Sequence, residues 1–567
     1  MVCAFAPAGG CHGSSIVGIQ QRSSLWRSND RARFSAGRHS RPTEFFRAAR
    51  SKRWRRELRA VAEMPGASKT SSRLEAFVKW LAANEVFVSD KATWGRASHP
   101  LVVAEQTLIE SEPAGRGFLA RRDIQAGEVL FQVPFHLCFT KDVAVRRFAA
   151  LNVPELADEE EFFALATLLL YERGLDESWK KSGRGPGSFW GPYLDILPPV
   201  PWEFKGAEPA ESLSMDPLDA LWLWAEDEMQ WLQGSPTLLS ARALRSKVER
   251  EYAEACERLY RRHPHIFDLE GAFRLERFLW AFGVLFSRAV SLPAENGMLA
   301  LVPYADLANH SAFCVSFIDA RTAAFPYAFR ASSKQKRGQW WQRFLAPNSD
   351  DAGAVANTDS SHYREDAQRE VVAYADRFYD KFEQVYVSYG QKSNAELLLL
   401  YGFVSDRNPY NSVEVCVSLS GSEAAGAGLL DRKRSFLLAC GRDPDKPECF
   451  PLYADRYPLE LMQLLRFASL TEQDAAGYSD LEQIDVAQPV NRENEIAAKS
   501  ALLQACKIAL QAYPTSADED DAALKDKSMA QLLSRKQRLS VRLRRSEKRI
   551  LERTIAGLER EIQDLRC

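Results

Sequence analysis

Strand-like and helix-like stretches alternate along this 567-residue chain, and their order constrains the fold more than any other feature. Residues 101–134 contain short runs rich in β-branched and aromatic side chains, which favour strands. Residues from about 140 to 290 instead place apolar side chains at the three- and four-residue steps of helices. Strand-like runs return at Leu299–Pro303 and Val385–Ser388. The order predicts an α+β fold whose strands are separated by a long helical region.

Several elements within this order are predicted individually. The segment Phe278–Val290 is apolar nearly all round a helix, so we expect a buried helix there. Two strand-like runs, Gly115–Ile124 and Glu128–Pro134, flank a turn at Gln125–Gly127 and are predicted to pair with each other. A polar stretch at about 330–370 indicates a loose loop. Further helices are expected at Ser71–Asn84, Glu159–Glu172, Leu221–Leu232 and Ser240–Tyr260.

The chain is too long for one ordinary domain, so we expect two or more folded units. Helical patterns dominate over residues 405–567, which predicts a second unit there. This unit ends in Leu533–Leu565, a segment rich in Arg and Glu with leucines and isoleucines at three- and four-residue steps. Such an amphipathic helix either packs on the surface of its own domain or forms a coiled-coil dimer. We favour the first arrangement and expect a monomer.

The first sixty residues differ sharply in composition from the rest. They contain thirteen Lys and Arg, from Arg22 to Arg59, against three acidic residues. Serine, alanine and glycine are frequent, and no long apolar run is present. This composition is typical of an organellar transit peptide, which we place at residues 1–65. The alternative is a disordered basic tail that binds polyanions.

Composition limits the kinds of partner and cofactor to expect. The formal net charge of −2 gives no reason to expect a nucleic-acid partner. No apolar run approaches the length that spans a bilayer, so no membrane association is expected. The ten cysteines form neither a CxxC pair nor a Cys/His cluster with zinc spacing. We therefore predict free thiols in a reducing compartment and no metal.

One candidate site segment is the polar string Pro303–Ser311 (PYADLANHS), which follows a predicted strand. The Asn309 amide can both donate and accept hydrogen bonds, which suits the binding of a polar ligand. Asp306 can bind a ligand or cap the turn that follows it. Alone, Asn309 and His310 form no more than a polar turn.

A second candidate segment is Tyr389–Phe403 (YGQKSNAELLLLYGF), with Tyr389 and Tyr401 near its two ends. A tyrosine ring offers an apolar wall, and its hydroxyl offers one oriented hydrogen bond. Two such rings suit a dry channel for an amine, from which water must be excluded before the amine can react. The alternative is a pair of half-buried core tyrosines.

Two further features point to ligand contacts. The Gly-Arg-Gly turn in Ala114–Phe118 permits close approach of a ligand to the backbone, because glycine has no Cβ. Ser287-Arg288 ends the predicted buried helix, and a buried arginine needs an anionic partner. That partner is either a ligand carboxylate or an acidic side chain of the same chain.

Together these segments resemble the SET-domain protein methyltransferases, specifically the plant Rubisco large-subunit lysine methyltransferase group. The resemblance covers residues from about 75 to 565, and Tyr513–Thr515 and Arg544–Leu551 look like parts of that group's substrate-binding domain. It implies a SET domain at 71–404, with small β-sheets and a knot-like C-terminal segment, split by a helical insertion at about 140–290. An all-α substrate-binding domain is then expected at 405–567.

The resemblance also implies a reaction and a set of site residues. The methyl donor would be S-adenosylmethionine, without a metal, and the acceptor would be the ε-amine of lysine in a protein substrate. Position 114 is often acidic in the plant enzymes, so only a main-chain contact is expected from Ala114. Donor contacts are expected from Ala114, Gly115, Arg116, Gly117, Arg288, Asn309 and His310. Substrate contacts are expected from Asp306, Tyr389 and Tyr401, and the two tyrosines are expected to be catalytic.

By the same resemblance, the substrate would be a plastid protein such as the Rubisco large subunit or fructose-bisphosphate aldolase. The location would be the chloroplast stroma, with the mitochondrion as the alternative. Two other functions stay open. A related SET subgroup methylates histidine, so the acceptor could be a histidine side chain. The chain could also be a non-catalytic binding protein that keeps a SET fold.

Overall fold

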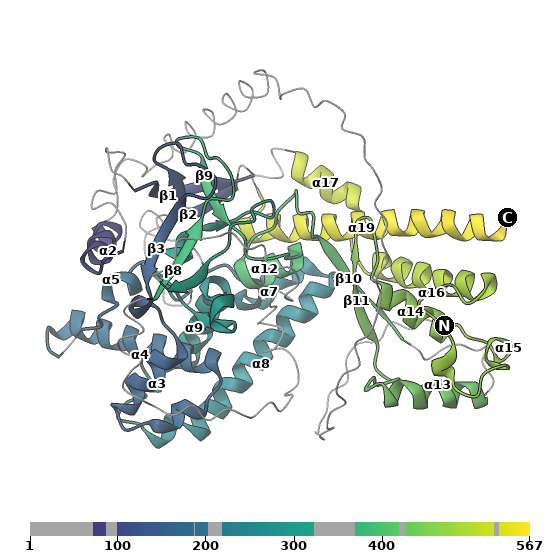
Figure 1. Ribbon diagram of the computed structural model, residues 1–567, viewed down its shortest axis with the longest axis horizontal. Coiled ribbons are helices and arrows are strands. Elements are labelled where there is room, and N and C mark those ends of the chain that lie inside the picture. Colours follow the sequence, from purple (N-terminus) through teal and green to yellow (C-terminus); the bar gives the residue numbers. More distant parts are fainter. Residues whose placement is uncertain are drawn as a thin grey trace.

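The structure is a computed structural model that describes residues 72–86, 99–110, 112–185, 187–201, 218–322, 369–418, 427–526 and 532–567. The proposed transit peptide lies outside the described residues, as does almost all of the predicted loop at 330–370. Figure 1 shows two regions side by side, a mixed region of strands and helices up to residue 404, here called the N-terminal region, and a mainly helical C-terminal region. The long helix α19 (Arg535–Arg566) runs from one region to the other.

Two small sheets form the centre of the N-terminal region, and each combines strands from before and after the helical insertion. The order of the first is β1-β2-β9-β6 and that of the second is β3-β8-β7. The first sheet contains β1 (Leu101–Ile109), β2 (Glu112–Ala120), β9 (Gln384–Val387) and β6 (Asn309–His310). The second contains β3 (Val129–Pro134), β8 (Arg369–Tyr374) and β7 (Asp319–Thr322), and β4 (Val290–Leu292) pairs separately with β5 (Met298–Ala300).

The prediction that β2 and β3 pair with each other is wrong. Phe118 of β2 lies opposite Val385 of β9, whereas Val133 of β3 lies opposite Val371 of β8. The turn between β2 and β3 is itself held by the later segment, because Gly127 N donates to the Ala375 carbonyl at 2.7 Å. A turn signal brings two runs close in sequence but does not decide which strand each run joins.

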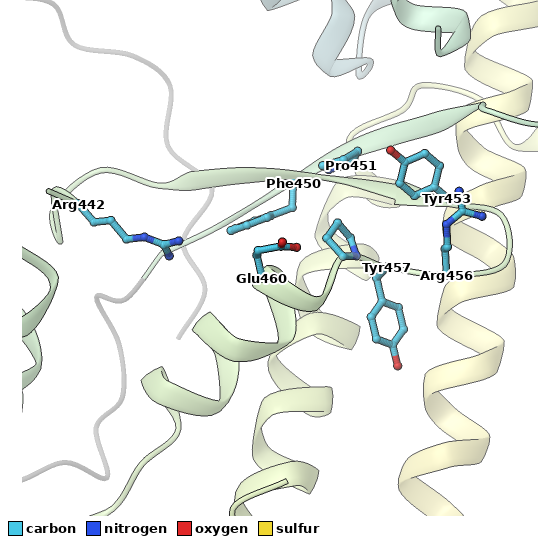
Figure 2. Close-up of a pocket in the computed structure, with 8 residues that line it drawn as sticks. Arg442, Phe450, Pro451, Tyr453, Arg456, Tyr457 and Glu460 are labelled. Carbon is cyan, nitrogen blue, oxygen red and sulfur yellow. The ribbon is translucent and has the colours of Figure 1, made fainter. Parts of the chain in front are cut away.

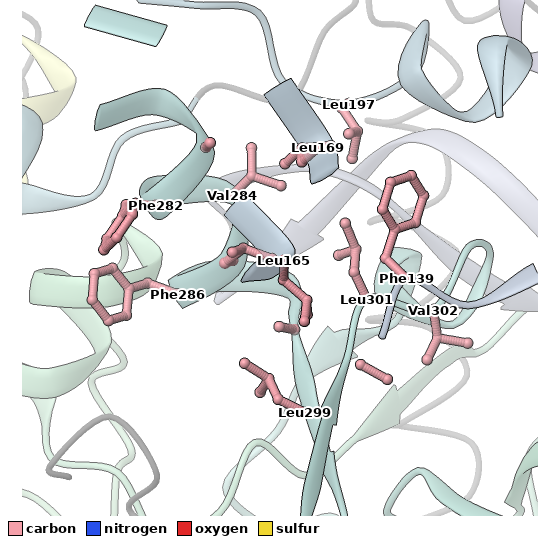
Figure 3. Packing of buried hydrophobic residues seen from close by; sticks show 14 of the residues in the cluster. Phe139, Leu165, Leu169, Leu197, Phe282, Val284, Phe286, Leu299, Leu301 and Val302 are labelled. Atoms are coloured by element: carbon pink, nitrogen blue, oxygen red, sulfur yellow. The ribbon is translucent and has the colours of Figure 1, made fainter. Parts of the chain in front are cut away.

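The helical insertion packs its apolar faces against the sheets. Two of its helices, α4 (Glu161–Ser182) and α9 (Leu275–Arg288), pack against each other, and the rings of Phe162 in α4 and Phe286 in α9 lie 4.7 Å apart between centroids. Figure 3 shows side chains of α4 and α9 gathered in this core with Leu299 of β5. The burial predicted for Phe278–Val290 is confirmed through most of α9. The other helices are α2 (Ser72–Ala83), α3 (Lys141–Ala149), α5 (Gly191–Leu194), α7 (Glu226–Met229), α8 (Pro236–Arg258) and α12 (Asn394–Tyr401).

The C-terminal region is helical, but it is not all-α as predicted. A two-stranded sheet joins β10 (Ser412–Val417) to β11 (Glu448–Tyr453). The inward side of β10 is apolar, with Val413 and Val415 buried, so alternating side chains make it a strand. None of the helices in the described ranges has the length and apolarity needed to cross a bilayer. The remaining helices are α13 (Ala427–Ala439), α14 (Leu459–Ala468), α15 (Glu472–Ala475), α16 (Arg492–Gln511) and α17 (Ala517–Lys525).

The prediction that all cysteines are free thiols is wrong for one pair. Cys416 of β10 and Cys449 of β11 lie directly opposite each other and form a disulfide. Their side chains share the exposed side of the two-stranded sheet, because residues in register on paired strands point to the same face. The sequence does not reveal this register. Free thiols are found at Cys138, Cys256, Cys314, Cys440, Cys506 and Cys567.

The sequence suggested that helix α19 packs on its own domain alone. In the structure it packs on both regions. Leu539 and Leu543, near its beginning, belong to the core of the N-terminal region. Ile550 and Leu558, further along, belong to the core of the C-terminal region. One helix therefore contributes to two hydrophobic cores and connects them.

Candidate active site

A cavity of about 340 Å³ lies between the N-terminal region and the beginning of α19. This volume falls in the range of small-molecule sites. Gly117 is the predicted site residue that does not line the cavity, and it lies directly behind the side chain of Asn309. The lining includes the other predicted residues, Ala114, Gly115, Arg116, Arg288, Asp306, Asn309, His310, Tyr389 and Tyr401.

Parallel pairing of β6 with β9 brings the two candidate strings together. His310 lies opposite Val387, so Tyr389 follows just beyond the end of the pairing. The Tyr389 backbone N–H donates to His310 Nδ1 at 3.0 Å. The two rings stack with centroids 5.0 Å apart and planes 22° apart. The strand pairing therefore sets the position of Tyr389 relative to the Asn-His segment.

The rings of Tyr389 and Tyr401 form the second stacked pair in the cavity. Their centroids are 4.8 Å apart and their planes differ by 26°. The Tyr389 hydroxyl donates to the Ala308 carbonyl at 2.7 Å, which fixes its direction. Burial raises the pKa of Tyr401, so its phenol stays protonated at neutral pH. Two neutral phenol rings thus wall one part of the cavity.

Local signals explain why Tyr401 ends its helix at this point. A capping box between Ser393 and Glu396 starts α12. Gly402 ends it with φ at +76°, and a Cβ at this position would lie 2.5 Å from the Asp219 carbonyl oxygen. Only glycine accommodates both the left-handed backbone and this close approach.

His310 is a neutral structural acceptor in this site. Burial lowers its pKa to about 4, with the positive charge of Lys392 adding a smaller effect in the same direction. Its Nδ1 atom accepts the hydrogen bond from the Tyr389 main chain. A neutral ring with this bond is suited to hold Tyr389 in place.

Asn309 ties the β1–β2 hairpin to the site. Its Nδ2 atom donates to Thr107 Oγ1 at 3.0 Å and to the Arg116 carbonyl at 3.1 Å. A Cβ on Gly117 would lie 2.4 Å from the same Nδ2 atom, so any larger residue there would displace the Asn309 amide. The side-chain amide N–H groups of Asn309 therefore have protein acceptors, and this side chain positions the Gly-Arg-Gly turn.

Arg288 pairs with an acidic residue of the same chain, which was one of the two options from sequence. Its Nη1 atom lies 3.2 Å from Asp306 Oδ2, and Tyr193 donates its hydroxyl to the same oxygen at 3.0 Å. Burial raises the pKa of Asp306, and the charge of Arg288 opposes this rise. Asp306 Oδ1 is buried and has no hydrogen-bond partner within the part of the chain that the structure describes. A buried acceptor without a partner in a cavity wall indicates a place for a ligand donor.

A strained residue precedes Asp306. Tyr304 has φ at +79° and ψ at −50°, which is the rare conformation of a γ-turn with positive φ. Its ring is buried, 4.8 Å from Phe118 and 6.0 Å from Phe131 between centroids. This packing holds the strained backbone in place, and the strain fixes the direction in which the chain enters Asp306.

The arginines of α19 are site residues that the sequence interpretation missed. Arg535, Arg538 and Arg542 line the same cavity as the two tyrosines. Their spacing places them on one helix face, which the sequence interpretation assigned to the surface. The signal in the sequence was this arginine-rich face, but nothing local showed which cavity it adjoins.

A second cavity, of about 480 Å³, lies in the C-terminal region beside β11. Figure 2 shows Phe450 and Tyr453 on this strand, with Arg442, Arg456 and Glu460 around them. The Arg456 guanidinium lies 4.5 Å from the centroid of the Tyr453 ring, so it makes a cation–π contact with that ring. The cavity contains none of the predicted site residues, and we do not assign it a reaction.

Comparison with known proteins agrees with this geometry. Residues 425–551 match the family described as Rubisco LSMT substrate-binding. The chloroplastic [fructose-bisphosphate aldolase]-lysine N-methyltransferase of Arabidopsis thaliana is 26% identical over 492 residues, covering 86% of this chain and 83% of that protein. The chloroplastic ribulose-1,5 bisphosphate carboxylase/oxygenase large subunit N-methyltransferase of Nicotiana tabacum is 26% identical, covering 78% and 75%. The actin-histidine N-methyltransferase of Homo sapiens is 25% identical over 80% of this chain, which spans 66% of that protein's length.

Solved structures show the same fold. A crystal structure described as the SET domain of LSMT bound to lysine and AdoHcy matches with a TM-score of 0.61 and 23% identity. The match covers 88% of this chain and 93% of that one. The predicted resemblance is therefore confirmed. The chain shares the fold of this SET-domain structure, and its residues 425–551 match the Rubisco LSMT substrate-binding family.

Proposed function

We propose that this protein transfers a methyl group from S-adenosylmethionine to the ε-amine of a lysine in a protein substrate. The observation that carries the proposal is the stacked pair Tyr389 and Tyr401, with the Tyr389 hydroxyl held by the Ala308 carbonyl. The pair lines one cavity with the Asn-His segment and the Gly-Arg-Gly turn. Relatives that are named protein methyltransferases support it.

The residues that line the cavity fit S-adenosylmethionine. When bound, this molecule supplies an electrophilic methyl group on a positively charged sulfur. Asp306 Oδ1 offers a buried acceptor for a donor group of the ligand, such as an ammonium. The turn at Gly115 exposes backbone to the cavity, which suits close contact with a flat or extended ligand.

The two tyrosines would prepare the lysine amine for reaction. A lysine side chain has a pKa near 10.4 in water, so its amine must first lose a proton. Apolar rings and nearby arginines both disfavour the charged ammonium and thus help that loss. The fixed Tyr389 hydroxyl would then orient the neutral amine, and the stacked rings would exclude water.

Histidine methylation is the second candidate function. Actin-histidine N-methyltransferases match 80% of this chain at 24–25% identity, close to the values for the two plant relatives. The presence of both Tyr389 and Tyr401 favours lysine. The identity of the modified side chain decides between the two acceptors.

We further propose a plastid location and a plastid protein as substrate. Both plant relatives above are named chloroplastic, and residues 1–65 have the composition of a transit peptide. The Rubisco large subunit and fructose-bisphosphate aldolase are the first substrates to test.

The direct test incubates the protein with methyl-labelled S-adenosylmethionine and a chloroplast stromal extract, followed by mass spectrometry of every labelled protein. We expect label on lysine in one or a few proteins, and far less label with Tyr389→Phe. Label on histidine would replace the lysine proposal with the second candidate. Binding of S-adenosylmethionine without any label, in stromal and cytosolic extracts alike, would indicate a binding protein instead.

A further inference from the structure

The disulfide between β10 and β11 lies on the exposed side of their two-stranded sheet. Cys416 and Cys449 are both exposed. The opposite side of β10 is buried and carries Val413, Val415 and Val417. A thiolate that reduces a disulfide must reach one of its sulfur atoms, so exposed disulfides are the labile ones in proteins. The position of this bond therefore makes it accessible to a reductant while the protein is folded.

The two strands are held together by more than the disulfide. Six residue pairs join them in antiparallel register, from Ser412 opposite Tyr453 to Val417 opposite Glu448. The buried valines of β10 pack with Leu452 of β11 in the core of the C-terminal region. Apolar burial and cross-strand contacts favour the paired strands whether or not the sulfur atoms are joined. We therefore expect the sheet to stay folded after reduction, so that the bond can open and close again.

The other cysteines indicate surroundings in which the bond can be reduced. Cys440 and Cys567 are exposed free thiols. Exposed free thiols persist in reducing compartments, where a disulfide is usually transient or redox-sensing rather than a permanent crosslink. An exposed disulfide in a chain with exposed free thiols fits this second kind. Free thiols are also found, in buried positions, at Cys138, Cys256, Cys314 and Cys506.

The disulfide closes a long segment that leads from one strand to the other. The two cysteines are 33 residues apart in the sequence, and α13 lies between them. Arg442, which follows α13, lies 3.3 Å from Glu448 at the start of β11. Arg442 also lines the second cavity together with Phe450 of β11, and Figure 2 shows both side chains. The bond thus ties together two parts of the chain that form this cavity.

Helix α13 is attached to the core independently of the disulfide. The Lys433 side chain is buried, and its Nζ atom donates to the carbonyls of Ala468 and Leu470 at 2.8 and 2.7 Å. These bonds join α13 to the end of α14, and reduction does not break them. The part of the segment that reduction releases most is therefore the stretch from the end of α13 into β11, at residues 440–453.

We propose that Cys416 and Cys449 form a reversible redox site that a dithiol opens, and that its state controls the mobility of residues 440–453. One thiolate of the dithiol attacks a sulfur of the pair, so the S–S bond breaks and a mixed disulfide forms. The second thiol of the reductant then displaces the bound cysteine. Two electrons and two protons pass to this chain, which gains two thiols, and the reductant gains a disulfide. This inference goes beyond the methyl-transfer reaction and does not depend on it.

Reduction of the folded full-length protein is the first test. The protein is treated with dithiothreitol without denaturant, alkylated with iodoacetamide and analysed by peptide mass spectrometry. We expect Cys416 and Cys449 to be alkylated after this treatment, protected before it, and protected again after incubation with glutathione disulfide. A pair that reacts only after urea has unfolded the protein would overturn the proposal. Free thiols at both positions even in glutathione disulfide would overturn it as well.

Hydrogen exchange measures the consequence of reduction. In the chain-entropy account, a tie across 33 residues restrains a free segment by roughly a few hundred-fold. The attachment of α13 leaves only part of this effect, so we expect amide exchange in residues 440–453 to rise about ten-fold on reduction. Exchange in α4 should not change. Equal exchange of residues 440–453 in the two states would overturn the proposal, and so would an equal rise throughout the chain.

Matched variants assign the effect to this pair of cysteines. Cys440→Ser removes an exposed free thiol of the same segment and should keep the full response to dithiothreitol. The double variant Cys416→Ser with Cys449→Ser should exchange like the reduced wild type in both conditions. Loss of the response in Cys440→Ser would assign it to the wrong thiol and overturn the proposal. The wild-type comparison needs no substitution, so it decides the question even where the double variant does not fold.

These measurements separate the inference from the proposed function. Alkylation and hydrogen exchange are carried out without S-adenosylmethionine, so a reversible redox response in a protein that transfers no methyl group would overturn only the proposed function. Methyl transfer to lysine by a protein whose disulfide resists dithiothreitol would overturn only the redox site.

Discussion

The C-terminal region and the active-site cavity treat buried charge in different ways. In the C-terminal region, Lys548 and Arg544 lie 2.6 and 3.1 Å from the Asp520 carboxylate, and all three residues are buried. Arg466 pairs in the same way with Glu495 at 2.6 Å. These pairs join α14 to α16 and α17 to α19, so opposite charges hold the helices of this region together.

The cavity leaves part of its polar surface unsatisfied. Asp306 uses one oxygen for Arg288 and Tyr193, while the other has no hydrogen-bond partner among the described residues. The backbone of Tyr304, two residues earlier, is strained. The comparison teaches that paired buried charges indicate structure, whereas unsatisfied and strained groups around a cavity indicate function.

Glu547 belongs to neither pattern, because it lies between the regions. Its carboxylate accepts from Ser235 and Thr237 at the start of α8 and from Tyr513 of the C-terminal region. Burial raises its pKa to about 7, and the hydroxyl donors oppose this rise. A carboxylate held by three hydroxyls is close to the balance between its charged and neutral forms at neutral pH.

The largest effect is expected from breaking a charge pair of the C-terminal region. Asp520→Ala leaves Lys548 and Arg544 buried without their carboxylate, so we expect a loss of about 3–5 kcal/mol in the free energy of unfolding. Urea titration followed by circular dichroism measures this. Asp518→Ala is the matched control, because the Asp518 side chain is 87% exposed and its pair with Arg549 should contribute under about 1 kcal/mol. Equal losses in the two variants would contradict a structural role for the buried pair.

The next effect concerns Glu547, which lies between the two regions, and it depends on pH. The folded state raises the Glu547 pKa from an ordinary 4.5 to about 7, so the folded protein binds this proton more tightly. The stabilisation is complete below pH 4.5 and is lost as pH rises through 7, by roughly 3 kcal/mol in total. In Glu547→Gln this dependence disappears. The difference in unfolding free energy between variant and wild type should therefore rise by that amount from pH 4.5 to 8, and parallel curves would contradict the assignment.

The smallest of the three effects is expected from removing the hydroxyl of Tyr389, and the matched comparison removes the hydroxyl of Tyr513. Tyr389→Phe removes the hydroxyl that donates to the Ala308 carbonyl. We expect turnover to fall roughly 100-fold because the lysine amine that accepts the methyl group loses its orientation. Affinity for S-adenosylmethionine, measured by calorimetry, should change little. Tyr513→Phe removes the hydroxyl that donates to Glu547, and it should reduce stability by about 1–2 kcal/mol without changing turnover. Unchanged turnover in Tyr389→Phe would remove that residue from catalysis.

Much of the local structure could be predicted from the sequence. The apolar spacing predicted helices at Ser71–Asn84 and Ser240–Tyr260, and the structure has α2 and α8 there. The two candidate segments, Pro303–Ser311 and Tyr389–Phe403, contain predicted site residues that do line one cavity. The expected helix at Leu221–Leu232 was less accurate, because it is broken into α7 and two single turns. Long segments with strong helical periodicity form the predicted helices, whereas the conformation of a short apolar stretch depends on the elements packed around it.

The sequence by itself determined which residues the cavity contains: the tyrosines, the Asn-His segment and the glycine turn. It also determined the capping signals that end α12 at Tyr401. Only the tertiary structure decided that α19 brings Arg538 to that cavity, that Arg288 pairs with Asp306, and that Cys416 meets Cys449. Local patterns follow from propensities within a few residues. Partners far apart in the chain are selected by the packing of whole elements, and no single segment encodes that packing.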